Sequence, residues 1–289
     1  MESGVQTDAR KPRPTREQVD VYGLTHKGHV RPENADHYLI ASLHKTMEVQ
    51  QSSLTPEQIG PLTSDSRGFV FLVADGVGST TSGREASETA LRAIVDYVLH
   101  SMDLFVRPMA DGKPTFLAEM KKSVEYGHEV VRAQAEKQRT PLMATTLTMV
   151  AVAWPRAYLI HVGDSRCYRL RGGRLEQLTT DQTMARALVE SGAMSEERAE
   201  HSRLKHVLWS VLGGETAAPE TALSECEWDD VMLICTDGLT KHVTDEEIAL
   251  QLRENPTSAA ACKKLVSMAL DRGGTDNVTV VIGRVHAAT

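Results

Sequence analysis

Five aspartates stand where short apolar runs of this sequence begin or end, which makes them the first candidates for chemistry. They are Asp36, Asp75, Asp164, Asp237 and Asp276. The segments VADGVG, HVGDSR and CTDGLT each place a carboxylate beside a glycine, where the backbone can approach a ligand closely because glycine has no Cβ. One Asp-Gly pair predicts only a turn. Several such pairs, each after an apolar run, predict carboxylates gathered at a common end of the sheets.

Carboxylates that gather in this way repel one another, so each must take a proton or share a cation. Hard oxygen ligands without histidine or cysteine favour Mg²⁺ or Mn²⁺ over zinc or copper. Two such ions lower the pKa of a water between them and hold the oxygens of a phosphoryl group during in-line displacement. The pattern therefore predicts phosphoester hydrolysis by a metal-activated water, with no covalent enzyme intermediate.

The apolar runs beside these aspartates have the length and composition of β-strands. Each is rich in aliphatic and aromatic residues and is bounded by turn residues. Gly172-Gly173 predicts a tight hairpin turn between two of them. Strands are predicted at residues 19–26, 36–43, 68–76, 145–154, 157–163, 166–170, 174–178, 229–238 and 276–285.

Helices are predicted where apolar residues recur at spacings of three and four. One follows Gly83 and extends to about Val98, a second spans Phe116 to about Gln138, and a third covers residues 261–270. Residues 244–247 have the form of a capping box and predict the start of a short helix. The stretch from Asp181 to about 208 is polar and helical in parts, and we interpret residues 183–207 as a flap.

Strands come in antiparallel-looking groups with helices in pairs after them, which differs from the alternation of a doubly wound sheet. This order predicts an α+β fold: a four-layer α-β-β-α sandwich with two packed, mainly antiparallel sheets flanked by helix pairs. Residues 1–17 are polar and predict a disordered leader, and residues 18–287 predict a single catalytic domain. A polar segment with two prolines at about 46–67 predicts a surface insertion.

Composition excludes several classes of protein. The chain has 289 residues, 41% hydrophobic and 25% charged, with a net charge of -7. An acidic chain without a concentrated basic face argues against nucleic acid as a partner. Four cysteines form no CxxC pair and suit a reducing compartment. No signal peptide and no apolar stretch of membrane-spanning length is found, so we expect a cytoplasmic, monomeric protein without membrane attachment.

Eight segments of the chain, in order, resemble the metal-dependent protein phosphatases of type 2C in their bacterial form. They are GHVRPENAD, ADGVGS, MATTLT, GDSRCYRL, LTTDQT, VLGG, CTDGLT and GGTDNVTVV. The resemblance extends from about Val21 to Val285. It implies the sandwich fold with metals at one end, and hydrolysis of phosphoserine and phosphothreonine on proteins. It also implies that residues 183–206 form the family's flap over the site.

The resemblance further implies a role for each matching residue. Asp75 would bridge two ions, and the carbonyl of Gly76 would bind one of them. Asp237 and Asp276 would complete the shell of the first ion. Asp36 would act mainly through metal-bound water.

Two more roles follow from the same resemblance. Arg31 would hold the substrate phosphate, for which a planar guanidinium fork is suited. Asp164 would hold a third ion, so that the centre would contain two or three Mn²⁺ or Mg²⁺ ions. The resemblance thus makes Arg31, Asp36 and Asp75 the expected catalytic residues.

Four positions depart from the family's pattern. Ala35 stands where many members have a glutamate that touches a metal through water, and its loss could lower metal affinity. Val77 stands where animal members have a histidine, Ser79 replaces a glycine, and Gln182 replaces a histidine. Every aspartate expected to bind a metal is present, so these changes are expected to modulate activity without abolishing it.

Some of these residues also have ordinary structural interpretations. Asp164 could be a turn carboxylate bonded to the neighbouring backbone. Asp181 is expected to be structural, Thr145 and Thr146 to pack and bond beneath the site, and His161 to be half-buried. The sequence lacks the cysteine-dependent phosphatase loop, the P-loop motif, HExxH and GxSxG.

The expected substrates are phosphorylated proteins, the products of a Hanks-type serine/threonine kinase in bacterial signalling. A sporulation- or stress-type phosphatase acting on an anti-sigma antagonist would share the chemistry. An alternative of another class is a pseudophosphatase, a signalling module that keeps the fold and binds a partner without turnover. Ala35 is the feature that favours this alternative.

Overall fold

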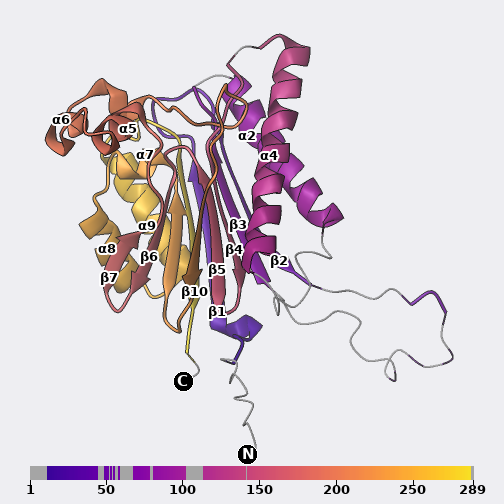
Figure 1. Cartoon of the computed structure of the whole chain (residues 1–289). Coiled ribbons are helices and arrows are strands. Elements are labelled where there is room, and N and C mark those ends of the chain that lie inside the picture. Colours follow the sequence, from indigo (N-terminus) through magenta and orange to yellow (C-terminus); the bar gives the residue numbers. More distant parts are fainter. Residues whose placement is uncertain are drawn as a thin grey trace, which may run out of the picture.

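Two five-stranded antiparallel sheets lie face to face, with helices on both outer surfaces, in the computed structural model of the chain (Figure 1). The structure describes residues 12–44, 49–51, 53, 55, 58, 68–78, 81–101, 113–140 and 142–287. The predicted α-β-β-α sandwich is therefore confirmed. Within the described residues, no helix is both long enough and apolar enough to cross a membrane.

The first sheet has the strand order β2-β3-β4-β5-β8. Side chains of β3 alternate between its two faces, as the two-residue period of a strand requires. Leu72 packs toward the helices, whereas Phe71 and Val73 pack between the sheets. The strands span β2 Asp36–Leu43, β3 Gly68–Asp75, β4 Leu147–Ala153, β5 Arg156–Val162 and β8 Glu220–Glu225.

The second sheet has the order β1-β10-β9-β6-β7. Val280 packs under the outer helices and Val281 packs between the sheets, so this sheet also contributes to two cores. Gly172 and Gly173 have positive φ in the hairpin that joins β6 to β7, as expected. The strands span β1 Val19–His26, β10 Val278–Val285, β9 Val231–Cys235, β6 Arg166–Arg171 and β7 Arg174–Gln177.

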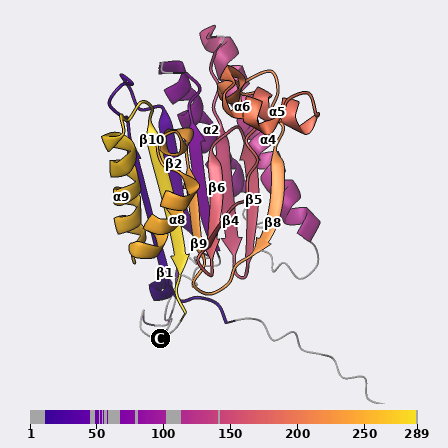
Figure 2. The ribbon, with the colours of Figure 1, turned by 90° about the vertical axis from the view of Figure 1, so that its left-hand side faces the viewer.

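Helices α2 (Thr81–His100) and α4 (Lys113–Gln138) cover the first sheet, and α8 (Asp245–Glu254) and α9 (Ser258–Asp271) cover the second (Figure 2). The capping box predicted at the start of α8 is present. The flap region contains α5 (Met184–Glu190), α6 (Glu196–Glu200) and the 3₁₀ turn η2 (Arg203–His206). Another 3₁₀ turn, η1 (Arg16–Gln18), precedes β1.

Two elements were missed by the sequence analysis. The edge strand β8 alternates weakly and is largely exposed, so its residues carry little apolar signal. The turn expected after β9 is a one-turn helix, α7 (Asp237–Thr240). Most of the predicted insertion at 46–67, residues 1–11 of the predicted leader, and Ser79 lie outside the described residues.

The strand ends explain why distant aspartates can meet. Asp75 ends β3, Asp36 begins β2, and α7 follows the end of β9. Asp276 lies two residues before the start of β10, and Asp164 lies in the turn between β5 and β6. In Figure 1, α7 lies at the end of the sandwich opposite the C-terminus, and the start of β10 lies at that end too, because the C-terminus follows the other end of this strand.

We predict that Gly238→Ala destabilises the fold at this end. A Cβ at Gly238 would overlap the backbone carbonyl of Asn277, so α7 would have to move away from β10. Overpacking against backbone costs about 1–3 kcal/mol, measurable as a lower melting temperature. Gly127→Ala is the control, because a Cβ there would approach the flexible side chain of Ile94 at 3.1 Å and the backbone oxygen of Ala90 only at 3.7 Å. Equal melting temperatures for the two variants would contradict this packing argument.

Candidate metal centre

Asp36 and Asp75 lie directly opposite each other on the neighbouring strands β2 and β3. One carboxylate oxygen of Asp36, Oδ2, accepts hydrogen bonds from Thr236 Oγ1 at 2.9 Å and Thr279 Oγ1 at 2.6 Å. Because both threonines belong to the second sheet, these bonds fix Asp36 across the interface between the sheets. The other oxygen, Oδ1, is buried and has no hydrogen-bond partner among the residues that the structure describes.

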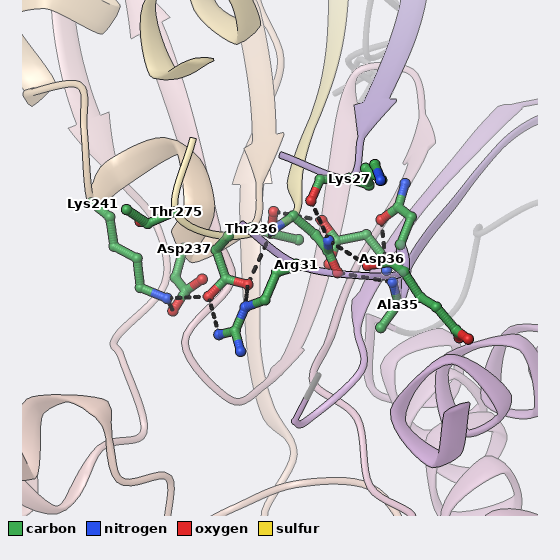
Figure 3. Close-up of polar contacts among 12 residues, drawn as sticks. Lys27, Arg31, Ala35, Asp36, Thr236, Asp237, Lys241 and Thr275 are labelled. Carbon is green, nitrogen blue, oxygen red and sulfur yellow. Dashed lines mark hydrogen bonds and ion pairs between the residues drawn. The ribbon is translucent and has the colours of Figure 1, made fainter. Parts of the chain in front are cut away.

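Asp237 approaches the same place from α7, after the end of β9 (Figure 3), and Asp276 lies just before β10 of the same sheet. Lys241 Nζ lies 2.6 Å from Asp237 Oδ2 and 2.7 Å from Asp276 Oδ2. Arg31 binds Asp276 with two hydrogen bonds, from Nε to Oδ1 at 2.7 Å and from Nη2 to Oδ2 at 2.8 Å. Asp237 Oδ1, like Asp36 Oδ1, is buried without a partner.

The loop that carries Arg31 is held by Asn277. Its side-chain oxygen accepts a hydrogen bond from the backbone N–H of Ala35 at 2.8 Å. Its amide nitrogen donates to the backbone carbonyls of Lys27 at 2.7 Å and Glu33 at 2.9 Å. A single side chain next to Asp276 thus holds both ends of the segment between β1 and β2.

Thr145 and Thr146 support Asp75 from below, as expected. Thr145 Oγ1 donates to the carbonyl of Asp75 at 2.8 Å, and the backbone N–H of Asp75 donates to Thr146 Oγ1 at 3.1 Å. Gly76 donates its N–H to the carbonyl of Ala35 at 3.2 Å. These bonds fix the backbone on both sides of the Asp75 carboxylate.

Asp164 is almost fully buried, and the loop before it is held by two buried side chains. Gln182 Oε1 accepts the N–H of Gly163 at 3.0 Å, and His161 Nε2 lies 2.9 Å from the Gly163 carbonyl. The prediction that His161 is half-buried was wrong: it is 1% exposed. Asp181 pairs with Arg166 at 2.7 Å, in line with the structural role expected for it.

Burial and mutual repulsion raise the pKa values of three carboxyl groups. Burial raises the pKa of Asp36 to about 7, although the two threonine hydrogen bonds oppose this shift. Burial, and then the charges of Asp36 and Asp237, raise the pKa of Asp75 well above its usual value. Burial and the charge of Asp237 raise the pKa of Asp164 to about 8.

Asp276 shows the opposite net shift. Burial acts to raise its pKa, but the hydrogen bonds from Arg31 and Lys241 outweigh burial, so the pKa is lowered. The site thus combines a carboxylate with cationic partners and three carboxyl groups for which a negative charge is costly.

The donor set fits hard divalent cations. The ligands on offer are carboxylate and carbonyl oxygens, and two of the carboxylate oxygens are buried without a partner. An unpaired buried oxygen of this kind is costly unless a cation or a donor reaches it. Mg²⁺ or Mn²⁺ bound near Asp36 and Asp237 would supply that partner.

Asp276 is not free to bind an ion in the arrangement observed. A carboxylate offers about four lone-pair positions. Asp276 Oδ1 accepts from Arg31 and from the N–H of Asn277, and Oδ2 accepts from Arg31 and Lys241. Among the described residues, no group of three acidic, histidine or cysteine side chains has an arrangement that could hold an ion. An ion at Asp276 requires Arg31 or Lys241 to give up a contact.

Sequence reasoning identified the aspartates and Arg31 but missed the residues that hold them. The motifs that contain Asp237 and Asp276 also contain Thr236, Asn277 and Thr279. No sequence pattern shows which group each of these side chains bonds. Lys241 could have been found from its spacing of four residues after Asp237, had the helix α7 been anticipated.

Comparison with known proteins agrees with this geometry. The sequence model of the protein phosphatase 2C family matches residues 62–274. The chain is 34% identical over 219 residues to the serine/threonine protein phosphatase PstP of Mycobacterium tuberculosis. The matched region covers 75% of this chain but only 40% of PstP. It is 31% identical over 214 residues to the serine/threonine phosphatase stp of Listeria monocytogenes, covering 74% of this chain and 83% of that protein.

Solved structures show the same similarity. The crystal structure of PstP from M. tuberculosis superposes with a TM-score of 0.74 at 28% identity, covering 93% of this chain and 99% of that one. A structure of the PstP catalytic domain in complex with two manganese ions gives a TM-score of 0.70 at 30% identity, with the same coverage. This chain belongs to the protein phosphatase 2C family.

We predict that the metal-free protein loses stability as the pH rises from about 5 to 8. The pKa values of Asp36 and Asp164, about 7 and 8, lie above the ordinary 3.8. Between pH 5 and 8 the native state therefore still holds protons that the unfolded chain has already lost near pH 4, so stability falls as the pH rises toward the native pKa values. Melting temperatures in EDTA would measure the slope.

Two further measurements check this pH dependence. Asp164→Asn should make the slope shallower, because one of the protons held by the native state is gone. Saturating Mn²⁺ should remove the fall in melting temperature with pH, because cations then replace the protons on the carboxylates. A melting temperature in EDTA that increases from pH 5 to 8 would show that the carboxylates do not repel one another as described.

Proposed function

We propose that this chain is a metal-dependent phosphatase that removes phosphate from phosphoserine and phosphothreonine side chains of proteins. The observation that carries the proposal is the pair of buried, unpartnered oxygens, Asp36 Oδ1 and Asp237 Oδ1, within a cluster of carboxylates. Membership of the protein phosphatase 2C family, with relatives named serine/threonine phosphatases, supports the same activity.

The residues proposed to hold the ions are Asp75, the carbonyl of Gly76, Asp237 and Asp276, with Asp36 acting mainly through water. Mn²⁺ or Mg²⁺ fits these oxygen ligands, and a catalytic domain similar to this chain is described with two manganese ions. Bound ions of this type acidify water and neutralise phosphoryl oxygens. Thr236 and Thr279 orient the carboxylate of Asp36, and Thr145 and Thr146 hold the backbone of Asp75, by the hydrogen bonds described above.

Arg31 is proposed to bind the substrate phosphate. Its planar fork now matches both oxygens of Asp276, and the same fork matches two oxygens of a phosphate. When Asp276 binds an ion it must give up a hydrogen bond, and release of Arg31 would both free a lone pair and leave the guanidinium available to the phosphate. Metal binding and phosphate binding would then support each other.

A cleft of about 790 Å³ beside the centre is the proposed entry for the phosphorylated side chain. It is lined by Asp164, Asp237 and Lys241 together with flap residues that include Arg186 and His206. A monomeric protein acting on the products of a serine/threonine kinase is consistent with such an open site. The acidic composition gives no support for a nucleic-acid partner.

The pseudophosphatase alternative rests on Ala35. Its side chain is buried, and its backbone carbonyl accepts a hydrogen bond from Ser87 at 2.6 Å. Position 35 thus contributes to holding the loop, and each of the five aspartates is retained. This favours the enzyme over a non-catalytic binding module.

We expect hydrolysis of p-nitrophenyl phosphate to require Mn²⁺ or Mg²⁺ and to stop in EDTA. Asp237→Asn should lower kcat/KM by roughly 100-fold or more, since changing even residues that only orient ligands costs 10–100-fold. Asp271→Asn, at an exposed position of α9, is the matched control and should behave as wild type. Turnover that persists in EDTA, or no turnover at saturating Mn²⁺, would refute the proposed enzyme.

Arg31→Ala is expected to raise KM for a phosphopeptide while increasing the affinity for Mn²⁺. The phosphate loses its guanidinium, whereas Asp276 loses a partner that competes with the ion. Steady-state kinetics and calorimetric titration with Mn²⁺ measure the two effects. Arg84→Ala removes an exposed arginine nearby, paired with Glu33 at 3.4 Å, and should change neither. If Mn²⁺ affinity falls in Arg31→Ala, competition between Arg31 and the ion is not the correct description.

A further inference from the structure

Lys241 contacts two of the carboxylates proposed to bind ions, and the sequence analysis gave it no role. It directly follows the one-turn helix α7, four residues after Asp237, so helical geometry returns its side chain to the Asp237 face. Its ammonium bridges Asp237 Oδ2 at 2.6 Å and Asp276 Oδ2 at 2.7 Å (Figure 3). The side chain is 27% exposed, so this contact is shielded from much of the solvent.

Lys241 also lies on the side of the centre where Asp164 is found. Both residues line the cleft under the flap, together with Asp237. The charge of Lys241 stabilises the carboxylate form of Asp164, opposing burial and the charge of Asp237. An ion held jointly by Asp164 and Asp237 would have to come close to this ammonium.

We propose that the ammonium of Lys241 takes the place of a third metal ion, so that the centre holds two ions and Asp164 binds none. This inference rests on the proposed two-ion phosphatase. The expected number of ions is then two, rather than two or three, and Asp164 no longer has the role of holding the third ion.

Electrostatics favours this arrangement. A lysine tethered four residues from Asp237 is always present at the site, whereas a third divalent ion would have to be recruited from solution against the repulsion of the ammonium. Five carboxylates are offset by two divalent ions, Arg31 and Lys241, which leaves a small positive surplus for a phosphate. A third divalent ion is not needed for charge balance.

Lys241 is compatible with the two proposed ions. It binds Oδ2 of Asp237 and leaves Oδ1 of that residue without a partner. At Asp276 it occupies one lone pair of Oδ2, and the N–H of Asn277 occupies one of Oδ1, so release of Arg31 alone would free one position on each oxygen. Lys241 can therefore stay in place while the first ion binds.

The test is the number of Mn²⁺ ions bound per chain, measured by equilibrium dialysis and elemental analysis at saturating Mn²⁺. We expect two ions for the wild type and three for Lys241→Asp, in which a carboxylate replaces the ammonium. The double variant Lys241→Asp with Asp164→Asn should return to two. Lys241→Asn, which removes the charge with a smaller perturbation, serves if Lys241→Asp does not fold.

Lys205→Asp is the matched control, because Lys205 lines the same cleft and the substitution changes the charge by the same amount. Among the described residues, the ammonium of Lys205 bonds only the Glu200 carbonyl. The Lys205→Asp variant should bind two ions. Three ions in the wild type, with one lost in Asp164→Asn, would overturn this inference and leave the phosphatase intact. Two ions in both wild type and Lys241→Asp would also overturn it. Fewer than two ions in the wild type would overturn the two-ion centre itself.

Discussion

Repulsion between buried carboxylates at one end of the sandwich is the constraint on which the rest of this site depends. Asp36, Asp75 and Asp164 are taken out of water close to other negative charges, so each gains a raised pKa. Such a cluster is stable only with protons or cations to neutralise it. The rest of the site can be understood as a means of placing this unfavourable cluster and then supplying the cations.

The two sheets place the cluster without requiring flexible loops to find it. Asp36 and Asp75 are fixed by the register of β2 and β3, and the hydroxyls of Thr236 and Thr279 bind Asp36 from the other sheet. The site therefore forms only when the sheets have packed. Rigid strand ends are well suited to hold ions at fixed separations, because the carboxylates cannot relax away from one another.

Side-chain cations and metal ions share the task of neutralisation. Arg31 and Lys241 occupy the lone pairs of Asp276, whereas Asp36 and Asp237 each keep one oxygen without a partner. Asp276 is therefore neutralised within the protein, whereas Asp36 and Asp237 still require a cation. Arg31 is the more exposed of the two cations, at 34% against 27% for Lys241, which suits exchange between a carboxylate and a phosphate.

The sequence alone determined the fold class and the candidate aspartates, because strand periodicity, helical spacing and Asp-Gly turns are local properties that survive without tertiary contacts. Nine predicted strands and three amphipathic helices correspond to observed elements, whereas exposed β8 and the single turn of α7 had too few periodic residues to be recognised. Only the tertiary structure decided which oxygens are satisfied, that Arg31 is bound to Asp276, and that Lys241 bridges two carboxylates. These facts depend on contacts between residues up to 245 positions apart, and no local pattern encodes the distance between two such side chains.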